Sequence, residues 1–187
     1  MRGARGWLVS LAIAFQFLTI LPSLIRRDLV PGEVGRAVCW FPLVGLAIGL
    51  VLVGVDLLIS PWLPPLVSSA LLVAFSIVLT GGLHFDGLMD CADGLFGGRD
   101  PEHRLEIMRD SRTGSFGVLA GSMVLILQVA ALSSLSGSLR QLALLTAPLL
   151  GRIAMVLGIC TIRYVRPAGL GRWFSDYAPR AVAVLGS

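Results

Sequence analysis

Five long apolar stretches constrain the fold of this chain more than any other feature. They lie roughly at residues 7–25, 37–59, 62–80, 115–135 and 139–162. Each is close to the ~20 residues that a helix needs to cross the hydrocarbon core of a bilayer. The sequence therefore predicts an all-α, polytopic integral membrane bundle with about five hydrophobic segments. These segments are expected to form a single membrane-embedded domain over residues 1–187.

The composition supports lipid as the solvent of this chain. Of its 187 residues, 56% are hydrophobic and only 14% are charged, so there is too little polar surface for a water-soluble globule. The first stretch resembles a signal peptide, but equally long stretches follow it and no clear cleavage site is present. We therefore interpret it as mature protein. Gln16, Thr19 and Pro22 make it the least secure span and a candidate interfacial or re-entrant segment.

The distribution of arginine predicts the orientation in the membrane. The chain holds 15 arginines and no lysine, and most of the arginines follow the first, third and fifth apolar stretches. If the stretches alternate across the bilayer, these groups share one side, which the positive-inside rule assigns to the cytoplasm. Arg2 and Arg5 disagree with this orientation unless the first stretch does not span. We expect a multi-pass protein of the cell inner membrane that contacts the lipid bilayer and no nucleic acid.

Acidic residues gather directly after the third apolar stretch. Seven of the 11 acids fall between Asp86 and Asp110. On a helix, which turns by about 100° per residue, Asp86, Asp90 and Asp93 would share one stripe. Three carboxylates on one stripe repel each other unless a cation lies among them, and oxygen ligands alone favour Mg²⁺ or Mn²⁺ over zinc. The alternative is a solvated polar helix end, but acids are costly at a membrane edge, which favours a functional role.

The next segment, "DPEHRLEIMRDSRTGS", begins as a predicted helix. Asp100 suits the N-cap of that helix and Pro101 its first position. Glu102, Glu106 and Asp110 would then lie on one helical face.

Two arginines flank Asp110 in the sequence "RDSRTG". Arg109 and Arg112 can grip phosphate oxygens bidentately, and Ser111 and Gly114 belong to a small polar loop that leaves room for a phosphate group. The alternative is an arginine-rich amphipathic helix that lies on anionic lipid. Residues 81–114 are thus predicted to form a cytosolic, acidic and arginine-rich active-site segment.

Two further charges lie inside apolar stretches. Arg152, in "APLLGRIAM", is well inside the fifth stretch, where a charge normally faces a partner or a cavity. We expect it to contact the acids that follow the third stretch or the phosphates of an anionic substrate. Asp56 lies in the second stretch and is interpreted as the end of a helix.

Acids for a divalent metal and arginines for phosphate, at one membrane face, indicate phosphoryl transfer. In that chemistry a metal neutralises the transferring phosphate and the leaving group, and a carboxylate can accept the proton of the nucleophile. The residues themselves name neither the donor nor the acceptor. A cation transporter is an alternative from another class, but it predicts acids within the spans, whereas these acids follow the third one.

A long motif in this chain resembles that of a known family. The stretch "TGGLHFDGLMDCADGLFGGRDPEHRLEIMRDSRTGSFGVLAG" is similar to the signature of cobalamin synthase, a membrane enzyme also called adenosylcobinamide-GDP ribazoletransferase. The resemblance extends to "FQFLTILP", "FPLVGLAIGL", "APLLGR" and "RYVRPAGLG", and so to nearly the whole chain. Members of that family usually continue with further hydrophobic segments, whereas this sequence ends at Ser187.

The resemblance implies a specific reaction. Adenosylcobinamide-GDP and α-ribazole, or α-ribazole 5′-phosphate, are joined to give adenosylcobalamin or its 5′-phosphate and GMP, with Mg²⁺ as the cofactor. The acidic positions of the family motif correspond to Asp86, Asp90, Asp93 and Asp110. The first three are the expected metal ligands. The expected phosphate-binding residues are Arg109, Ser111, Arg112, Gly114 and Arg152.

A CDP-alcohol phosphotransferase is the nearest alternative enzyme class. It also places clustered aspartates and Mg²⁺ at a membrane face. Its signature, however, pairs an aspartate-glycine with alanine-arginine and spaces the later acids differently, which this chain does not match.

Overall fold

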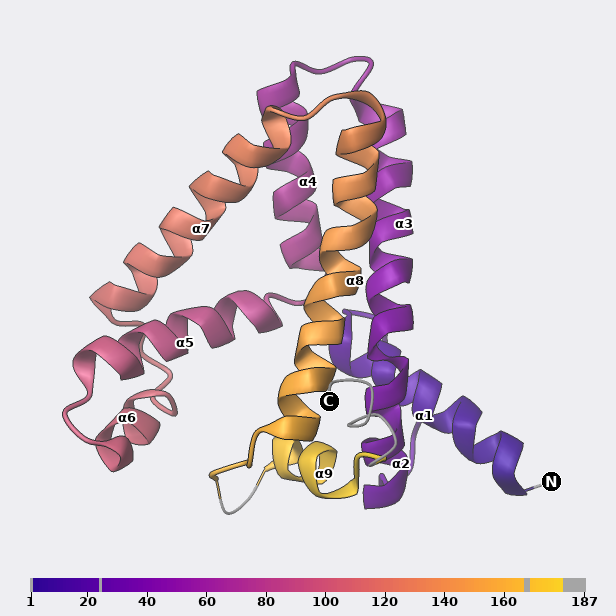
Figure 1. Ribbon diagram of the computed structural model, residues 1–187, viewed down its shortest axis with the longest axis vertical. Helices are drawn as coiled ribbons and strands as arrows, with labels where there is room; N and C mark the ends of the chain where they lie inside the picture. Colours follow the sequence, from indigo (N-terminus) through magenta and orange to yellow (C-terminus); the bar gives the residue numbers. More distant parts are fainter. Residues whose placement is uncertain (1, 24, 167–168, 180–187) are drawn as a thin grey trace. The chain divides into compact units, whose positions relative to one another are not determined.

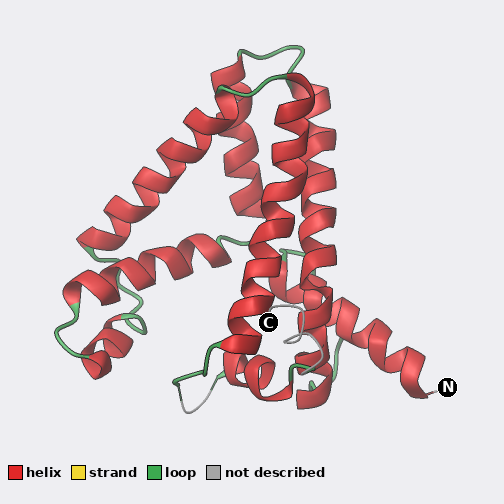
Figure 2. Ribbon diagram, viewed as in Figure 1, coloured by secondary structure: helices red, strands yellow, loops and turns green. Residues whose placement is uncertain are grey.

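The computed structural model describes residues 2–23, 25–166 and 169–179, and every regular element within these ranges is a helix (Figures 1 and 2). The all-α prediction is confirmed. The elements are α1 (Arg2–Leu18), α2 (Pro31–Ala37), the 3₁₀ turn η1 (Val38–Trp40), α3 (Phe41–Ile59), α4 (Pro65–Leu79), α5 (Leu83–Gly97), α6 (Pro101–Ile107), α7 (Ser115–Ser133), α8 (Gly137–Thr161) and α9 (Leu170–Tyr177).

Three helices in the described part of the chain are long and apolar enough to cross a membrane. They are Pro31–Ile59, which joins α2, η1 and α3, and then α7 and α8. The third predicted stretch forms α4, which has only 15 residues and reaches the length of a span only together with α5. The first stretch forms the short helix α1, in agreement with its being the least secure span. Each of the five predicted stretches therefore contains a helix, although the first is helical only as far as Leu18, and three or four of them are long and apolar enough to span.

A sharp bend separates α4 from α5. The two helix axes differ by 89° across the sequence Thr80-Gly81-Gly82. Gly81 and Gly82 have φ angles of 60° and 71°, and the Gly82 N–H donates to the Ile77 carbonyl at 2.8 Å. This left-handed conformation costs other residues roughly 1–2 kcal/mol, so the glycine pair is what allows α4 to end and α5 to leave in a new direction.

The chain divides into two compact units. The first unit comprises Met1–Gly54 and Gln141–Ser187. In it, Phe17 and Phe41 both pack on Phe174 of α9, with ring centroids 4.7 and 5.5 Å from that ring. Helices α3 and α8 approach closely: a Cβ atom at Gly45 would lie 2.5 Å from the Pro148 carbonyl oxygen, and one at Gly49 would lie 2.5 Å from that of Leu145. Small residues thus permit backbone contact between these two helices.

The second unit, Val55–Arg140, contains the predicted active-site segment. Helix α7 packs on both α4 and α5, and α6 packs on α5. At the α5–α7 contact, Gly121 faces Met89 and Phe85, and a Cβ atom at Gly121 would lie 3.2 Å from Met89 Cγ. This packing fixes α5 against the start of α7.

Candidate active site

Helix α5 presents the predicted acidic stripe. Because Asp86, Asp90 and Asp93 all lie within Leu83–Gly97, the helical spacing expected from the sequence is present. Their environments differ: Asp86 is exposed, Asp90 is half-buried, and Asp93 is only 9% exposed. The Asp86 end of the stripe is therefore accessible to solvent, and the Asp93 end is buried within the second unit.

The carboxylate of Asp93 binds the start of α7. The Gly114 N–H donates to Asp93 Oδ2 and the Gly117 N–H donates to Asp93 Oδ1, each at 2.8 Å. These backbone groups belong to the first turn of a helix, where N–H groups have no intrahelical acceptor. A carboxylate also complements the positive end of the helix dipole. Asp93 thus acts as a cap on α7 from another helix.

Helix α6 begins as predicted but ends early. Asp100 caps it by accepting a hydrogen bond from the His103 N–H at 2.8 Å, and Pro101 is its first residue. The helix stops at Ile107, where the Asp110 N–H donates to the Ile107 carbonyl three residues back. The prediction that Asp110 shares a helical face with Glu102 was wrong, because this tight turn breaks the helical register before Asp110.

Asp110 and Arg112 form a local ion pair in the loop between α6 and α7. Arg112 Nε lies 3.1 and 3.0 Å from the two carboxylate oxygens of Asp110, and Arg112 Nη2 lies 2.7 Å from Oδ2. These side-chain hydrogen bonds, with a further one from the Arg112 N–H, lower the pKa of Asp110 to about 2. Asp110 is therefore an anion at neutral pH that orients the guanidinium of Arg112.

Three of the four predicted phosphate-binding residues of this loop are exposed to solvent. Arg109, Ser111 and Arg112 are exposed, and Gly114 is half-buried at the N-cap of α7. The side chain of Arg112 is 88% exposed. Polar and cationic side chains of this loop thus lie at the surface of the second unit. The loop directly precedes the start of α7, which Asp93 binds.

The donor set on α5 suits a magnesium ion that shares its coordination with a substrate. Within the described residues, no group of three or more histidine, cysteine or acidic side chains converges as a complete metal site. Mg²⁺ does not need such a cage, because it commonly uses one or two carboxylates together with water and substrate phosphates. Asp86 and Asp90, one helical turn apart, provide two such carboxylates.

Arg152 is buried in the middle of α8. It is 7% exposed, and its Nε and Nη2 atoms have no hydrogen-bond partner among the residues that the structure describes. It belongs to the first unit, whereas the acids of α5 belong to the second. A buried guanidinium with unpaired donors is suited to an anionic ligand.

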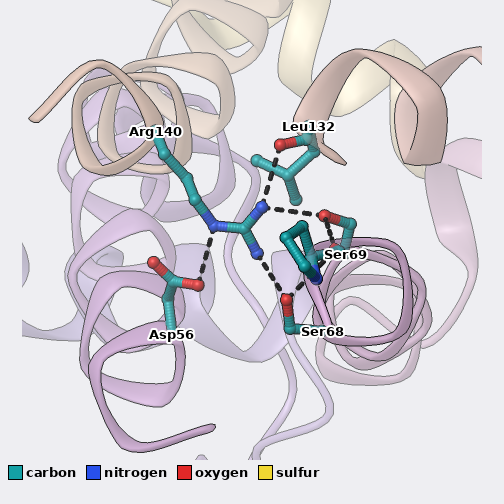
Figure 3. A network of polar contacts seen from close by, with 6 residues as sticks. Asp56, Ser68, Ser69, Leu132 and Arg140 are labelled. Atoms are coloured by element: carbon teal, nitrogen blue, oxygen red, sulfur yellow. Dashed lines mark hydrogen bonds and ion pairs between the residues drawn. The ribbon is translucent and has the colours of Figure 1, made fainter. Parts of the chain in front are cut away.

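Sequence reasoning missed Arg140, the most highly bonded charge in the described part of the chain. Its guanidinium lies among Asp56, Ser68 and Ser69 and the carbonyl of Leu132 (Figure 3). Asp56 and Arg140 are 3% and 6% exposed. The signal was present in the sequence, because opposite charges lie near the end of the second apolar stretch and the start of the fifth, which the alternating topology places at one membrane face.

Comparisons with known proteins identify the family. A family model described as cobalamin-5-phosphate synthase matches residues 10–187. The adenosylcobinamide-GDP ribazoletransferase of Pseudomonas paraeruginosa is 43% identical over 94% of this chain and 71% of its own length. The proteins of that name from Syntrophobacter fumaroxidans and Desulfitobacterium hafniense are 42% and 40% identical, over 68% and 66% of their lengths. No solved structure matches the chain.

These matches include α5, the loop that carries Asp110 and Arg112, and α8. The sequence spans about two thirds of the length of these relatives, at 66–71%. At 40–43% identity over nearly all of the present sequence, the chain belongs to the cobalamin-5-phosphate synthase family, and it is a transferase.

Proposed function

We propose that this protein joins adenosylcobinamide-GDP to α-ribazole, or to α-ribazole 5′-phosphate, and releases GMP. The products are adenosylcobalamin, or its 5′-phosphate, in the last steps of cobalamin biosynthesis. The observation that carries the proposal is the family match over residues 10–187, which includes the acidic helix and the arginine loop of the second unit. The names of its relatives supply the two substrates.

The reaction is a substitution at phosphorus. A ribose hydroxyl of α-ribazole forms a bond to the phosphorus atom nearest cobinamide, and the bond from that phosphorus to the oxygen bridging to GMP breaks. GMP leaves with the bridging oxygen, and the proton of the hydroxyl passes to a carboxylate or to water. The residues required are therefore those that hold a diphosphate, balance its charge and accept a proton.

We assign the metal to Asp86 and Asp90. When bound, Mg²⁺ would neutralise charge on the diphosphate and on the departing GMP. The sequence also predicts Asp93 as a ligand, but its two oxygens already accept hydrogen bonds from Gly114 and Gly117, and it is only 9% exposed. The exposed Asp86 is thus the better placed of the acids to meet a substrate phosphate.

The loop between α6 and α7 is the proposed phosphate-binding element. Arg109 and Arg112 provide the positive charge, and the Ser111 hydroxyl can donate a further hydrogen bond. Asp110 holds the fork of Arg112 in one orientation. For the first unit, we propose that Arg152 binds a phosphate oxygen of the substrate through its unpaired Nε and Nη2 donors.

The decisive assay measures GMP release by the purified protein in lipid nanodiscs. Adenosylcobinamide-GDP and α-ribazole are supplied with Mg²⁺ or with excess chelator, and CDP-diacylglycerol with an alcohol acceptor serves as the control donor. We expect GMP only with the first donor, only with α-ribazole or its phosphate, and only with Mg²⁺. CMP release from the control donor would instead support a CDP-alcohol phosphotransferase.

We further propose that the active-site segment faces the cytoplasm of the inner membrane. The clustered arginines support this orientation through the positive-inside rule. Single cysteines at Ser111 and Arg172, in a variant lacking Cys39, Cys91 and Cys160, should react with an impermeant reagent only from the cytosolic side. A cysteine at Ser136 should react only from the other side, and labelling of the Ser111 position from outside contradicts the orientation.

A further inference from the structure

Asp93 of α5 binds the C-terminal end of the loop that carries the proposed phosphate-binding residues. Both oxygens of this carboxylate accept backbone hydrogen bonds, from residues 21 and 24 positions later in the chain. Hydrogen bonds from backbone N–H groups to an ionised carboxylate are among the stronger ones in proteins. Because Asp93 is 9% exposed, water competes little for them.

The two donors are glycines because the carboxylate occupies the space that a side chain would need. A Cβ atom built at Gly114 or at Gly117 would collide with the carboxylate oxygens of Asp93. The Cβ atom at Gly117 would also lie 3.0 Å from the backbone carbonyl oxygen of Met89 on α5. The start of α7 therefore lies directly against α5 only because positions 114 and 117 lack side chains.

The N-terminal end of the same loop is attached to the next residue of α5. Met108 packs on Gly94, where an added Cβ atom would lie 2.6 Å from Met108 Cγ and 3.0 Å from the Arg104 carbonyl oxygen. Gly94 is buried. The consecutive residues Asp93 and Gly94 thus hold the two ends of the segment 108–114, one by hydrogen bonds and the other by close packing.

We propose that Asp93 is a positioning residue rather than a metal ligand. It fixes the segment 108–114 on the helix that carries Asp86 and Asp90, so that Arg109 and Arg112 are held at a constant distance from those two acids. The functional part of this inference rests on the proposed transfer reaction. The attachment itself concerns only the chain's own residues and can be tested without substrate or metal.

Hydrogen exchange of the metal-free, substrate-free protein tests the attachment. In the parent, the amides of a peptide covering residues 113–118 should be protected. Asp93→Asn replaces one acceptor by an amide donor, so exchange in this peptide should become at least tenfold faster, while a peptide from the middle of α8 is unchanged. Exchange within twofold of the parent overturns the proposal. If Asp93→Asn is not recovered in the membrane, Gly117→Ala is used in its place, and exchange in the same two peptides is compared with the parent.

Magnesium titration of the transfer rate tests the role in the reaction. Asp93→Asn and Gly117→Ala should both lower the maximal rate by tenfold or more, with the Mg²⁺ concentration for half-maximal rate within twofold of the parent. Asp86→Asn should raise that concentration. Gly54→Ala, at a site where a Cβ atom meets nothing within 4 Å, is the matched control and should behave as the parent.

The two proposals fail in different ways. If Asp93→Asn raises the Mg²⁺ requirement as Asp86→Asn does, while Gly117→Ala is active, Asp93 is a ligand and the positioning role is wrong. If the parent releases no GMP from adenosylcobinamide-GDP, the proposed reaction is wrong, and the exchange experiment still decides whether Asp93 holds the loop.

Discussion

Arg140 Nε lies 2.9 Å from Asp56 Oδ1 in the interior of the second unit. The pair joins the end of α3 to the start of α8, and Ser68, Ser69 and the Leu132 carbonyl accept the other hydrogen bonds of the guanidinium (Figure 3). A buried charge of this kind is stable only when its donors are satisfied. This network therefore ties together the ends of four apolar helices.

Removing one partner of this pair should destabilise the fold strongly. Asp56→Asn leaves the Arg140 guanidinium buried without a negative charge beside it. Loss of one partner of a buried ion pair typically costs about 3–5 kcal/mol. Thermal unfolding in detergent should show a large decrease in the melting temperature. Asp176→Asn is the matched control, because the Arg172–Asp176 pair is half-exposed and such i,i+4 pairs contribute only about 0.3–0.5 kcal/mol. Equal shifts in the two variants contradict a structural role for Asp56.

The proposed metal ligands should be required for turnover but not for folding. Asp86→Asn and Asp90→Asn each remove one carboxylate from an acidic helix, which relieves like-charge repulsion. A Mg²⁺ ion held by these acids would contribute several kcal/mol at the transition state, so the transfer rate should fall by roughly a hundredfold or more. Glu102→Gln and Glu106→Gln change exposed acids of α6 and serve as controls. Near-normal turnover of both α5 variants excludes this metal assignment.

The pKa of Asp110 gives a prediction about pH. Arg112 lowers this pKa to about 2, below the ~3.9 of an unfolded aspartate. The contact is therefore fully present above pH ~4 and is lost as the pH falls through about 2. Carbon-13 NMR of labelled aspartate should show a midpoint for Asp110 near 2 in the parent and near the unfolded value in Arg112→Gln. A midpoint above 4 in the parent contradicts the ion pair.

The acidic helix and the cap of α6 could be predicted because both depend on local spacing. Asp86, Asp90 and Asp93 follow helical periodicity, and Asp100-Pro101 is a local start signal. The different role of Asp93 could not be predicted, because its two donors lie 21 and 24 residues away and become neighbours only when α7 packs on α5. Long-range packing decided which of three similar carboxylates is exposed.

The ion pair of Arg140 with Asp56 is a second contact that local sequence spacing does not predict. Arg140 and Asp56 are 84 positions apart, and neither has an oppositely charged residue nearby in the sequence. Only the antiparallel arrangement of α3 and α8 brings them together. Charged residues at the ends of apolar stretches are thus candidates for ion pairs. Which of them pair with each other depends on how the helices are arranged in space.

Arg152 differs from Arg140 in that its Nε and Nη2 donors have no hydrogen-bond partner among the residues that the structure describes. An unpaired arginine at the centre of a span costs roughly 2.5–3.5 kcal/mol on insertion scales, so at 7% exposure we expect Arg152 to have a partner, which we propose is a phosphate of the substrate. Arg152→Lys keeps the charge but loses the planar fork that holds two oxygens at once, and should retain the fold but lose most of the transfer rate. Arg152→Leu should insert at least as well as the parent and be inactive.

Steady-state kinetics and thermal unfolding separate a binding role from a structural one. If Arg152 binds a substrate phosphate, the melting temperature of Arg152→Leu should be unchanged or higher, while kcat/KM for adenosylcobinamide-GDP falls by at least tenfold. Arg140→Leu should show the opposite pattern of a large loss of stability, since the buried Asp56 carboxylate is left without its charged partner. The hydroxyls of Ser68 and Ser69 also lose a donor, although each still donates to the Pro65 carbonyl. If Arg152→Lys and Arg152→Leu both turn over like the parent, the guanidinium has no part in substrate binding.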